Sequence, residues 1–114
     1  MSTTPQTVIS TDAGLVRLIN MFTVAPGRQA ELVAVLDRTT RVFFATVPGF
    51  RSANVHASRD GTRVVNYAQW ASAGHFEAML RMPEARPHLA EIAALVEQSD
   101  PTLYEVRSTH HGAP

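Results

Sequence analysis

The spacing of apolar residues along the chain switches repeatedly between the period of a strand and that of a helix, and this constrains the fold more than any other feature. Within residues 15–24 apolar side chains recur at alternate positions, which predicts a strand. Pro26 and Gly27 interrupt it, and the apolar residues of 31–47 then gather near one helical stripe. The chain therefore opens with a strand followed by a long amphipathic helix.

The next strong signal is the dipeptide Asp60-Gly61, which stands between two further segments with strand spacing. Asp-Gly favours the tight turn of a β-hairpin. Residues 50–58 are therefore predicted to pair directly with residues 63–70, whose β-branched and aromatic content also favours a strand.

The rest of the chain has helical spacing followed by a short strand. Ser72 suits a helix N-cap, and Pro83 divides the helical pattern into residues 74–82 and 84–98. Residues 103–108 are predicted to form the last strand. The order of elements is therefore β-α-β-β-α-β.

This order predicts a ferredoxin-like α+β fold, in which a four-stranded antiparallel sheet carries helices on one face. We expect one domain over residues 14–108, preceded by a disordered arm at 1–13 and followed by a loose tail at 109–114. The strands are apolar on both faces, so the uncovered face would expose a large apolar patch. A homodimer formed through that face is the expected remedy.

Composition excludes several classes of function. The chain has no cysteine, which excludes thiolate metal sites and thiol nucleophiles and favours a cytoplasmic location. Ten basic residues balance ten acidic ones, so neither nucleic acid nor an anionic membrane is an expected partner. No apolar run approaches the roughly 20 residues of a membrane span, and no glycine-rich phosphate loop or metal-ligand spacing is present.

Polar residues inside apolar strands are the clearest candidates for function. Asn20 shares a strand face with Leu18 and Phe22, so its amide is expected to point into the apolar interior, where it needs a partner or a ligand. Asn66 and Trp70 are four residues apart and therefore share a face of their own strand. These groups form either structural bridges in the core or one wall of a ligand pocket.

Three segments resemble the antibiotic biosynthesis monooxygenase family, and within it the small quinone-forming oxygenases of aromatic polyketide pathways. They are Val-Pro-Gly-Phe at 47–50, the hairpin His-Ala-Ser-Arg-Asp-Gly-Thr at 56–62, and Val-Val-Asn-Tyr-Ala-Gln-Trp at 64–70. Asn-Met-Phe-Thr-Val at 20–24 precedes them. The resemblance spans residues 15–108.

The resemblance implies a dimeric α+β barrel that oxidises an anthrone-type substrate to a quinone with O2, without metal, flavin, haem or any other cofactor. It implies catalytic roles for Asn20, Asn66 and Trp70. The substrate contacts that we assign are Phe22, Phe43, Phe76, Met79 and His88. Some relatives carry a tyrosine at the position of Phe76 and an arginine near Leu89 or Ala90, so proton transfer through a phenol is not expected here.

Two other classes of function stay open at this point. Related dimeric barrels degrade haem held by a helix histidine, and His88 lies in a similar position, although Met79 stands where those enzymes have a tryptophan. A non-oxidative polyketide-binding cyclase or isomerase fits the same fold. The general base is either His88 or a water molecule held by the asparagines.

Overall fold

The computed structural model describes residues 4–114. Its strands are β1 (Val16–Val24), β2 (Phe50–Ala57), β3 (Arg63–Trp70) and β4 (Val96–Tyr104). Its α-helices are α1 (Gln29–Val42), α2 (Ala73–Leu80) and α3 (Arg86–Ala93), with short 3-10 turns at Phe44–Thr46 and Pro83–Ala85. None of these helices is long and apolar enough to cross a bilayer.

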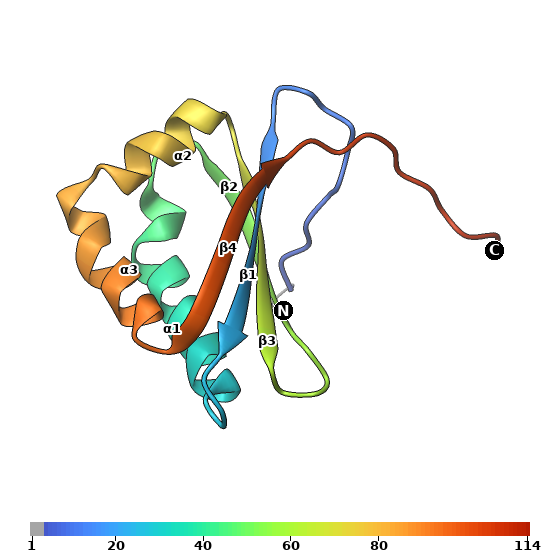
Figure 1. Cartoon of the computed structure of the whole chain (residues 1–114). Helices are drawn as coiled ribbons and strands as arrows, with labels where there is room; N and C mark the ends of the chain where they lie inside the picture. The colour runs from blue at the N-terminus through green and yellow to red at the C-terminus, as the bar shows by residue number, and fades with distance from the viewer. Residues whose placement is uncertain (1–3) are drawn as a thin grey trace.

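The strands form one antiparallel sheet in the order β2-β3-β1-β4, and the helices lie against one face of it (Figure 1). We call this the inner face and the opposite one the outer face. The expected ferredoxin-like α+β arrangement is confirmed. The long connection through α1 places β1 beside β3, so the two strands that carry the candidate asparagines are direct neighbours.

The hairpin between β2 and β3 forms where Asp60-Gly61 predicts it. Gly61 has a φ of 79°, a conformation that suits glycine. Oδ1 of Asp60 accepts hydrogen bonds from the Thr62 hydroxyl at 2.7 Å, the Ser58 hydroxyl at 2.8 Å and the Thr62 amide at 3.0 Å. These bonds lower the pKa of Asp60 to about 2, because they stabilise the carboxylate form. The bond from the Thr62 hydroxyl contributes most to this shift.

Gly49 and Ser72 join the start of β2 to the start of α2. Ser72 caps α2 as predicted, because its hydroxyl accepts from the amide of His75 at 3.1 Å. Gly49 has a φ of 88°, and a Cβ there would overlap the His75 ring. The Gly49 carbonyl accepts from the Ala71 amide at 2.7 Å, which fixes the end of β3 that carries Trp70.

The structure corrects the bounds of two predicted helices. The first helix ends at Val42 rather than at residue 47, and a 3-10 turn follows it. The last helix ends at Ala93 rather than at residue 98, and β4 occupies Val96–Tyr104 instead of residues 103–108. The helical spacing of apolar residues continues past the end of α3. The residues from Val96 onward nevertheless pair with β1 and form a strand.

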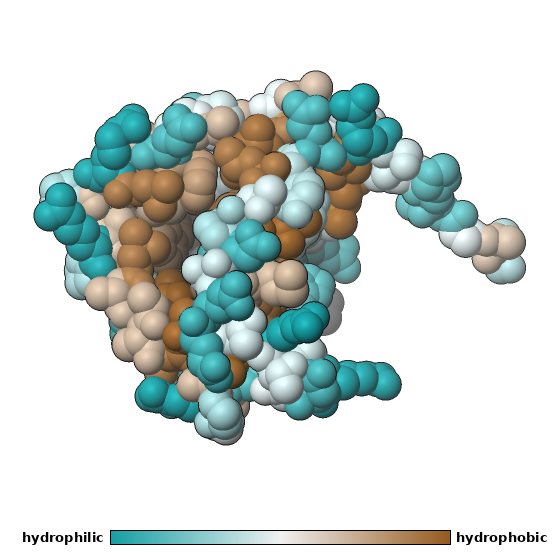
Figure 2. Space-filling model, in the orientation of Figure 1, coloured by the Kyte–Doolittle hydropathy of each residue, from teal (hydrophilic) through white to brown (hydrophobic). Residues whose placement is uncertain are grey.

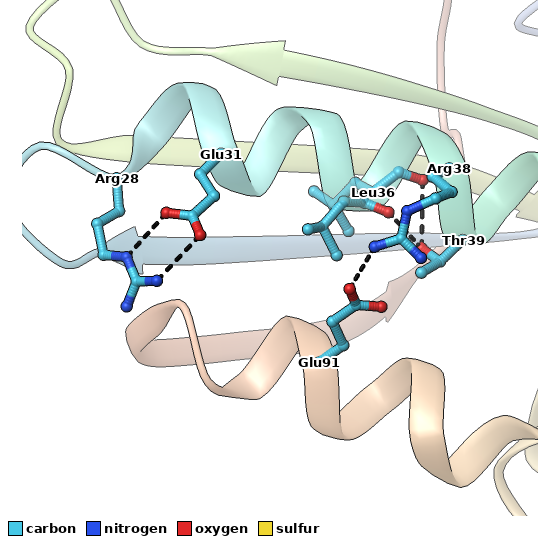
Figure 3. Close-up of polar contacts among 7 residues, drawn as sticks. Arg28, Glu31, Leu36, Arg38, Thr39 and Glu91 are labelled. Atoms are coloured by element: carbon cyan, nitrogen blue, oxygen red, sulfur yellow. Dashed lines mark hydrogen bonds and ion pairs between the residues drawn. The ribbon is translucent and has the colours of Figure 1, made fainter.

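The core lies between the inner face and the helices, in two apolar clusters. One is centred on Phe22, Leu32, Leu36 and Val64, and the other on Leu18, Ala68, Trp70 and Met79. An ion pair between Arg38 of α1 and Glu91 of α3 ties these two helices together at the surface, while Arg28 and Glu31 pair near the start of α1 (Figure 3). The helices thus cover the inner face of the sheet.

Candidate active site

A cavity of about 360 Å³ lies between the inner face of the sheet and the helices that cover it. Figure 2 shows apolar side chains gathered around a hollow between the helices and β4. Most of the wall is apolar, and the polar side chains that line it are those of Asn20, Thr40, Asn66 and Ser99, with the indole of Trp70. An apolar cavity with a few polar groups is the usual form of a small-molecule site.

Asn20 of β1 and Asn66 of β3 are direct cross-strand partners on the wall of the cavity. Side chains in such pairs have Cβ atoms about 4.5 to 5.5 Å apart, so the two amides are neighbours. The Oδ1 atoms of both are buried and have no hydrogen-bond partner. The antiparallel register therefore places two unsatisfied amides side by side.

Trp70 lines the cavity and is only 2 % exposed. Its ring meets Phe50 edge-on with centroids 5.5 Å apart, and Phe76 with centroids 5.8 Å apart. These contacts hold the indole in place, while its buried Nε1 has no hydrogen-bond partner. Trp70 lies two inward-facing positions beyond Asn66 on the same strand, so its N–H lies on the same wall as the amides.

Three unsatisfied polar atoms on one wall require an explanation, because leaving a buried donor or acceptor unpaired costs about 1 to 3 kcal/mol each. A core that served packing alone would be more stable with apolar groups at these positions. A bound molecule or water that pairs with Asn20, Asn66 and Trp70 removes the cost. These three atoms are therefore available to pair with a bound molecule or with water.

The structure brings most of the predicted substrate contacts to the cavity, but not all of them. Phe22, Phe76 and Met79 line it. Phe43 and His88 are not among its lining residues. Their rings instead stack on each other, with centroids 4.9 Å apart and an interplanar angle of 19°. This placement gives no support to His88 as a haem ligand or as the general base in the cavity.

Several lining residues were missed by sequence reasoning. Thr40 and Phe44 come from α1 and the turn after it, Phe50 from the start of β2, and Ser99 from β4. Thr40 follows Leu36 by one helical turn, so a polar residue in an apolar stripe was an available signal. Ser99 gave no such signal, because its segment was not recognised as a strand.

None of the described residues that line the cavity has an ionisable side chain of the Asp, Glu, His, Lys or Arg type. Within residues 4–114, no group of three or more His, Asp or Glu side chains is placed to hold a metal ion. The wall therefore offers hydrogen bonds, shape and an apolar environment, but no charged acid or base.

The chain is similar in sequence to known monooxygenases. Residues 15–91 match the family model described as antibiotic biosynthesis monooxygenase. The chain is 43 % identical over 98 residues to the tetracenomycin-F1 monooxygenase of Streptomyces glaucescens, a match that covers 86 % of this chain and 87 % of that one.

Two solved structures are similar in both sequence and fold. SnoaB, a cofactor-independent oxygenase from Streptomyces nogalater, is 36 % identical with a TM-score of 0.77, and the match covers 85 % of this chain and 97 % of SnoaB. A monooxygenase from the gene ActVA-Orf6 of Streptomyces coelicolor, in complex with the ligand nanaomycin D, is 34 % identical with a TM-score of 0.67. That match covers 88 % of this chain and 93 % of the other.

Proposed function

Because the chain belongs to the antibiotic biosynthesis monooxygenase family and is a monooxygenase that needs no cofactor, we propose that it oxidises an anthrone-type aromatic polyketide to a quinone with O2. The related tetracenomycin-F1 monooxygenase and SnoaB support this class of reaction, and the structure bound to nanaomycin D supports this class of ligand. The cavity walls, rich in phenylalanine, suit a flat aromatic molecule.

The observation that carries the proposal is the row of unsatisfied polar atoms on Asn20, Asn66 and Trp70. An anthrone is a flat apolar ring system with one carbonyl oxygen, and that oxygen becomes negatively charged when the opposite ring methylene loses a proton. The unpaired indole N–H of Trp70 is a donor that can stabilise the developing oxyanion, and the Nδ2 groups of Asn20 and Asn66 are further donors from the same wall. The unpaired Oδ1 atoms of the two amides are acceptors, which suit a water molecule. Their position in an apolar cavity strengthens each bond.

The proposed chemistry needs only the substrate and O2. The methylene loses a proton to give an enolate, which transfers one electron to O2. The substrate radical and superoxide then combine, and after protonation the carbon bears a hydroperoxide. Loss of water from that group leaves the new carbonyl, so one oxygen atom enters the quinone and the other leaves as water.

The protein contributes position, desolvation and hydrogen bonds to this sequence. Because no charged acid or base lines the cavity, we propose that a water molecule held by the amide oxygens of Asn20 and Asn66 accepts the methylene proton. The pH dependence of turnover then follows the acidity of the bound anthrone rather than that of a histidine.

We also propose that the enzyme is a homodimer that works in the cytoplasm. Met21 of β1 and Tyr104 of β4 are exposed apolar side chains, and the strand register places them on the outer face of the sheet. A second copy packed on this face would bury them. The absence of cysteine supports the cytoplasmic location.

The test of the proposed function is oxygen consumption by the purified protein with a simple anthrone, in the presence of a metal chelator and without flavin, nicotinamide or reductant. We expect enzyme-dependent O2 uptake with one O2 consumed for each quinone formed. Dependence on an added cofactor would contradict the proposal. Substrate binding without O2 uptake, with a cyclised or isomerised product, would favour the non-oxidative alternative.

A further inference from the structure

Arg17 is a buried cation on the outer face of the sheet, away from the cavity. It is only 1 % exposed, and none of the ion pairs among residues 4–114 includes it. Its guanidinium donates instead to backbone carbonyls. Nη2 bonds Ser10 O at 2.7 Å, and Nη1 bonds Asp12 O at 3.1 Å and Leu15 O at 3.3 Å. Neutral dipoles of the preceding segment therefore replace water around this charge.

Two of these carbonyls, those of Ser10 and Asp12, belong to residues 4–14, which we call the arm, and Leu15 follows it directly. Figure 1 shows it on the side of the sheet that faces away from the helices. The side chain of Gln69, which pairs with Arg17 across β1 and β3, donates to Val8 O at 3.1 Å. Nδ2 of Asn54 donates to the Thr7 hydroxyl at 2.6 Å. Side chains from β1 (Arg17), β3 (Gln69) and β2 (Asn54) thus hold the arm against the outer face.

The arm is additional to the family domain, since the match to the family model begins at residue 15. It carries two exposed apolar side chains, Val8 at 78 % and Ile9 at 51 %. With Met21 and Tyr104 of the sheet, they give this side of the molecule an apolar surface. Such a surface fits an apolar partner, and a second copy brings the same surface.

Two further polar atoms lie buried on the outer face. Nε of Arg17 and the hydroxyl of Tyr67 are both buried and have no hydrogen-bond partner. Both residues lie on the outer face, on neighbouring strands and two positions apart in register. The arm therefore supplies partners to Nη1 and Nη2 of Arg17 but leaves these two buried atoms unpaired.

We propose that the arm is part of the homodimer interface and that it makes this interface possible by solvating Arg17 with its carbonyls. Packing a second copy on the sheet without the arm would transfer the guanidinium from water into an apolar interface, which is strongly unfavourable for a charge without partners. With the arm in place, Nη1 and Nη2 of Arg17 are already hydrogen-bonded in the free protomer. The inference rests on the proposed homodimer and is independent of the chemistry in the cavity.

A double-mutant cycle tests this role. The dimer dissociation constant is measured by sedimentation for the full chain, a variant lacking residues 2–13, Arg17→Met, and the two changes combined. We expect the truncation to raise the dissociation constant at least about tenfold when Arg17 is present. In the Arg17→Met background the same truncation should raise it by a clearly smaller factor, because only the apolar contacts of the arm are lost and no charge needs solvation there.

Controls separate this role from general packing. Arg17→Lys keeps a charge, so truncation should still weaken its dimer, whereas Arg17→Leu serves as a second apolar variant if Arg17→Met does not melt cooperatively. Equal effects of truncation with and without the charge would overturn the proposal, since the arm would then act through apolar contact alone. A full-length chain that stays monomeric at all concentrations would overturn the homodimer and this role together, while leaving the oxygenase proposal standing if O2 uptake persists.

Discussion

Asn20 and Asn66 face each other across β1 and β3, and the carbonyl oxygens of both amides are buried without partners on the wall of an apolar cavity. This pairing depends on the register of two strands that are far apart in the chain. β1 ends at Val24, and β3 begins 39 residues later at Arg63. The register thus brings two isolated polar residues into one site, whose amide oxygens can accept from a water molecule and whose Nδ2 groups can donate to an oxyanion.

Replacing either amide should slow turnover and leave the fold intact. Asn66→Ala and Asn20→Ala each remove a donor to the oxyanion, a loss that commonly raises the barrier by about 2.7 to 4 kcal/mol, or roughly a hundredfold or more in kcat. Gln98→Ala, which removes an exposed amide from β4, is the matched control and should keep full activity. Steady-state kinetics with an anthrone, beside thermal melting curves, make the comparison. A variant that loses stability but keeps its kcat would assign the amide to packing.

Trp70→Phe separates the hydrogen bond of the indole from its volume. The variant keeps an aromatic ring between Phe50 and Phe76 but lacks the N–H, which is buried and unpaired in the structure. We expect kcat to fall by tens to hundreds of times with a smaller change in KM. A rise in KM at constant kcat would instead indicate that Trp70 only shapes the cavity.

His88→Ala should affect stability more than chemistry. The imidazole stacks on Phe43 outside the cavity, and an aromatic pair contributes about 0.5 to 1.5 kcal/mol beyond its buried area. The expected change in kcat is therefore less than about tenfold, and the pH–rate profile should keep its shape. Loss of the acidic limb of that profile in His88→Ala, where the rate rises with pH, would show that the histidine acts as the base.

How much of this site the sequence predicts depends on the kind of element involved. Strand period placed Asn20 on the inner face of its own strand, and Asn66 and Trp70 on that of theirs, because alternation is a local property. Which residue faces which across the two strands was not predictable, since register depends on the whole sheet. The stacking of His88 on Phe43 was missed for a similar reason, because it joins α3 to the end of α1.

The last strand shows a different limit. Apolar spacing through Leu95 extends the helical pattern, so the sequence favours a longer helix and a later strand. In the structure β4 is an edge strand, where proline is tolerated, and β1 pairs with it from Val96 onward. Ser99 enters the cavity wall only through this pairing.

Acid stability should depend on Asp60. Its folded-state pKa of about 2 lies below the ordinary value of 3.8, so the ionised carboxylate stabilises the fold. This contribution is present above the ordinary value and is lost as the pH falls from about 4 toward about 2. Asp60→Asn should therefore unfold more easily at neutral pH and show a flatter dependence of unfolding free energy between pH 4 and pH 2. Urea titrations across this range make the test, and parallel curves for the two proteins would show that Asp60 is not a source of the acid sensitivity.

The most direct test of the central claim is isotopic labelling of the quinone. An anthrone is oxidised by the purified enzyme under ¹⁸O2 in ordinary water, with a metal chelator and without any added cofactor, and the product is analysed at once by mass spectrometry. Product incubated in ¹⁸O-water corrects for exchange of the carbonyl oxygen. The proposed reaction predicts one ¹⁸O atom in each quinone, formed at a rate that falls roughly a hundredfold or more in Asn66→Ala. Quinone without label, or label formed equally fast by Asn66→Ala, would contradict oxygenation at this wall.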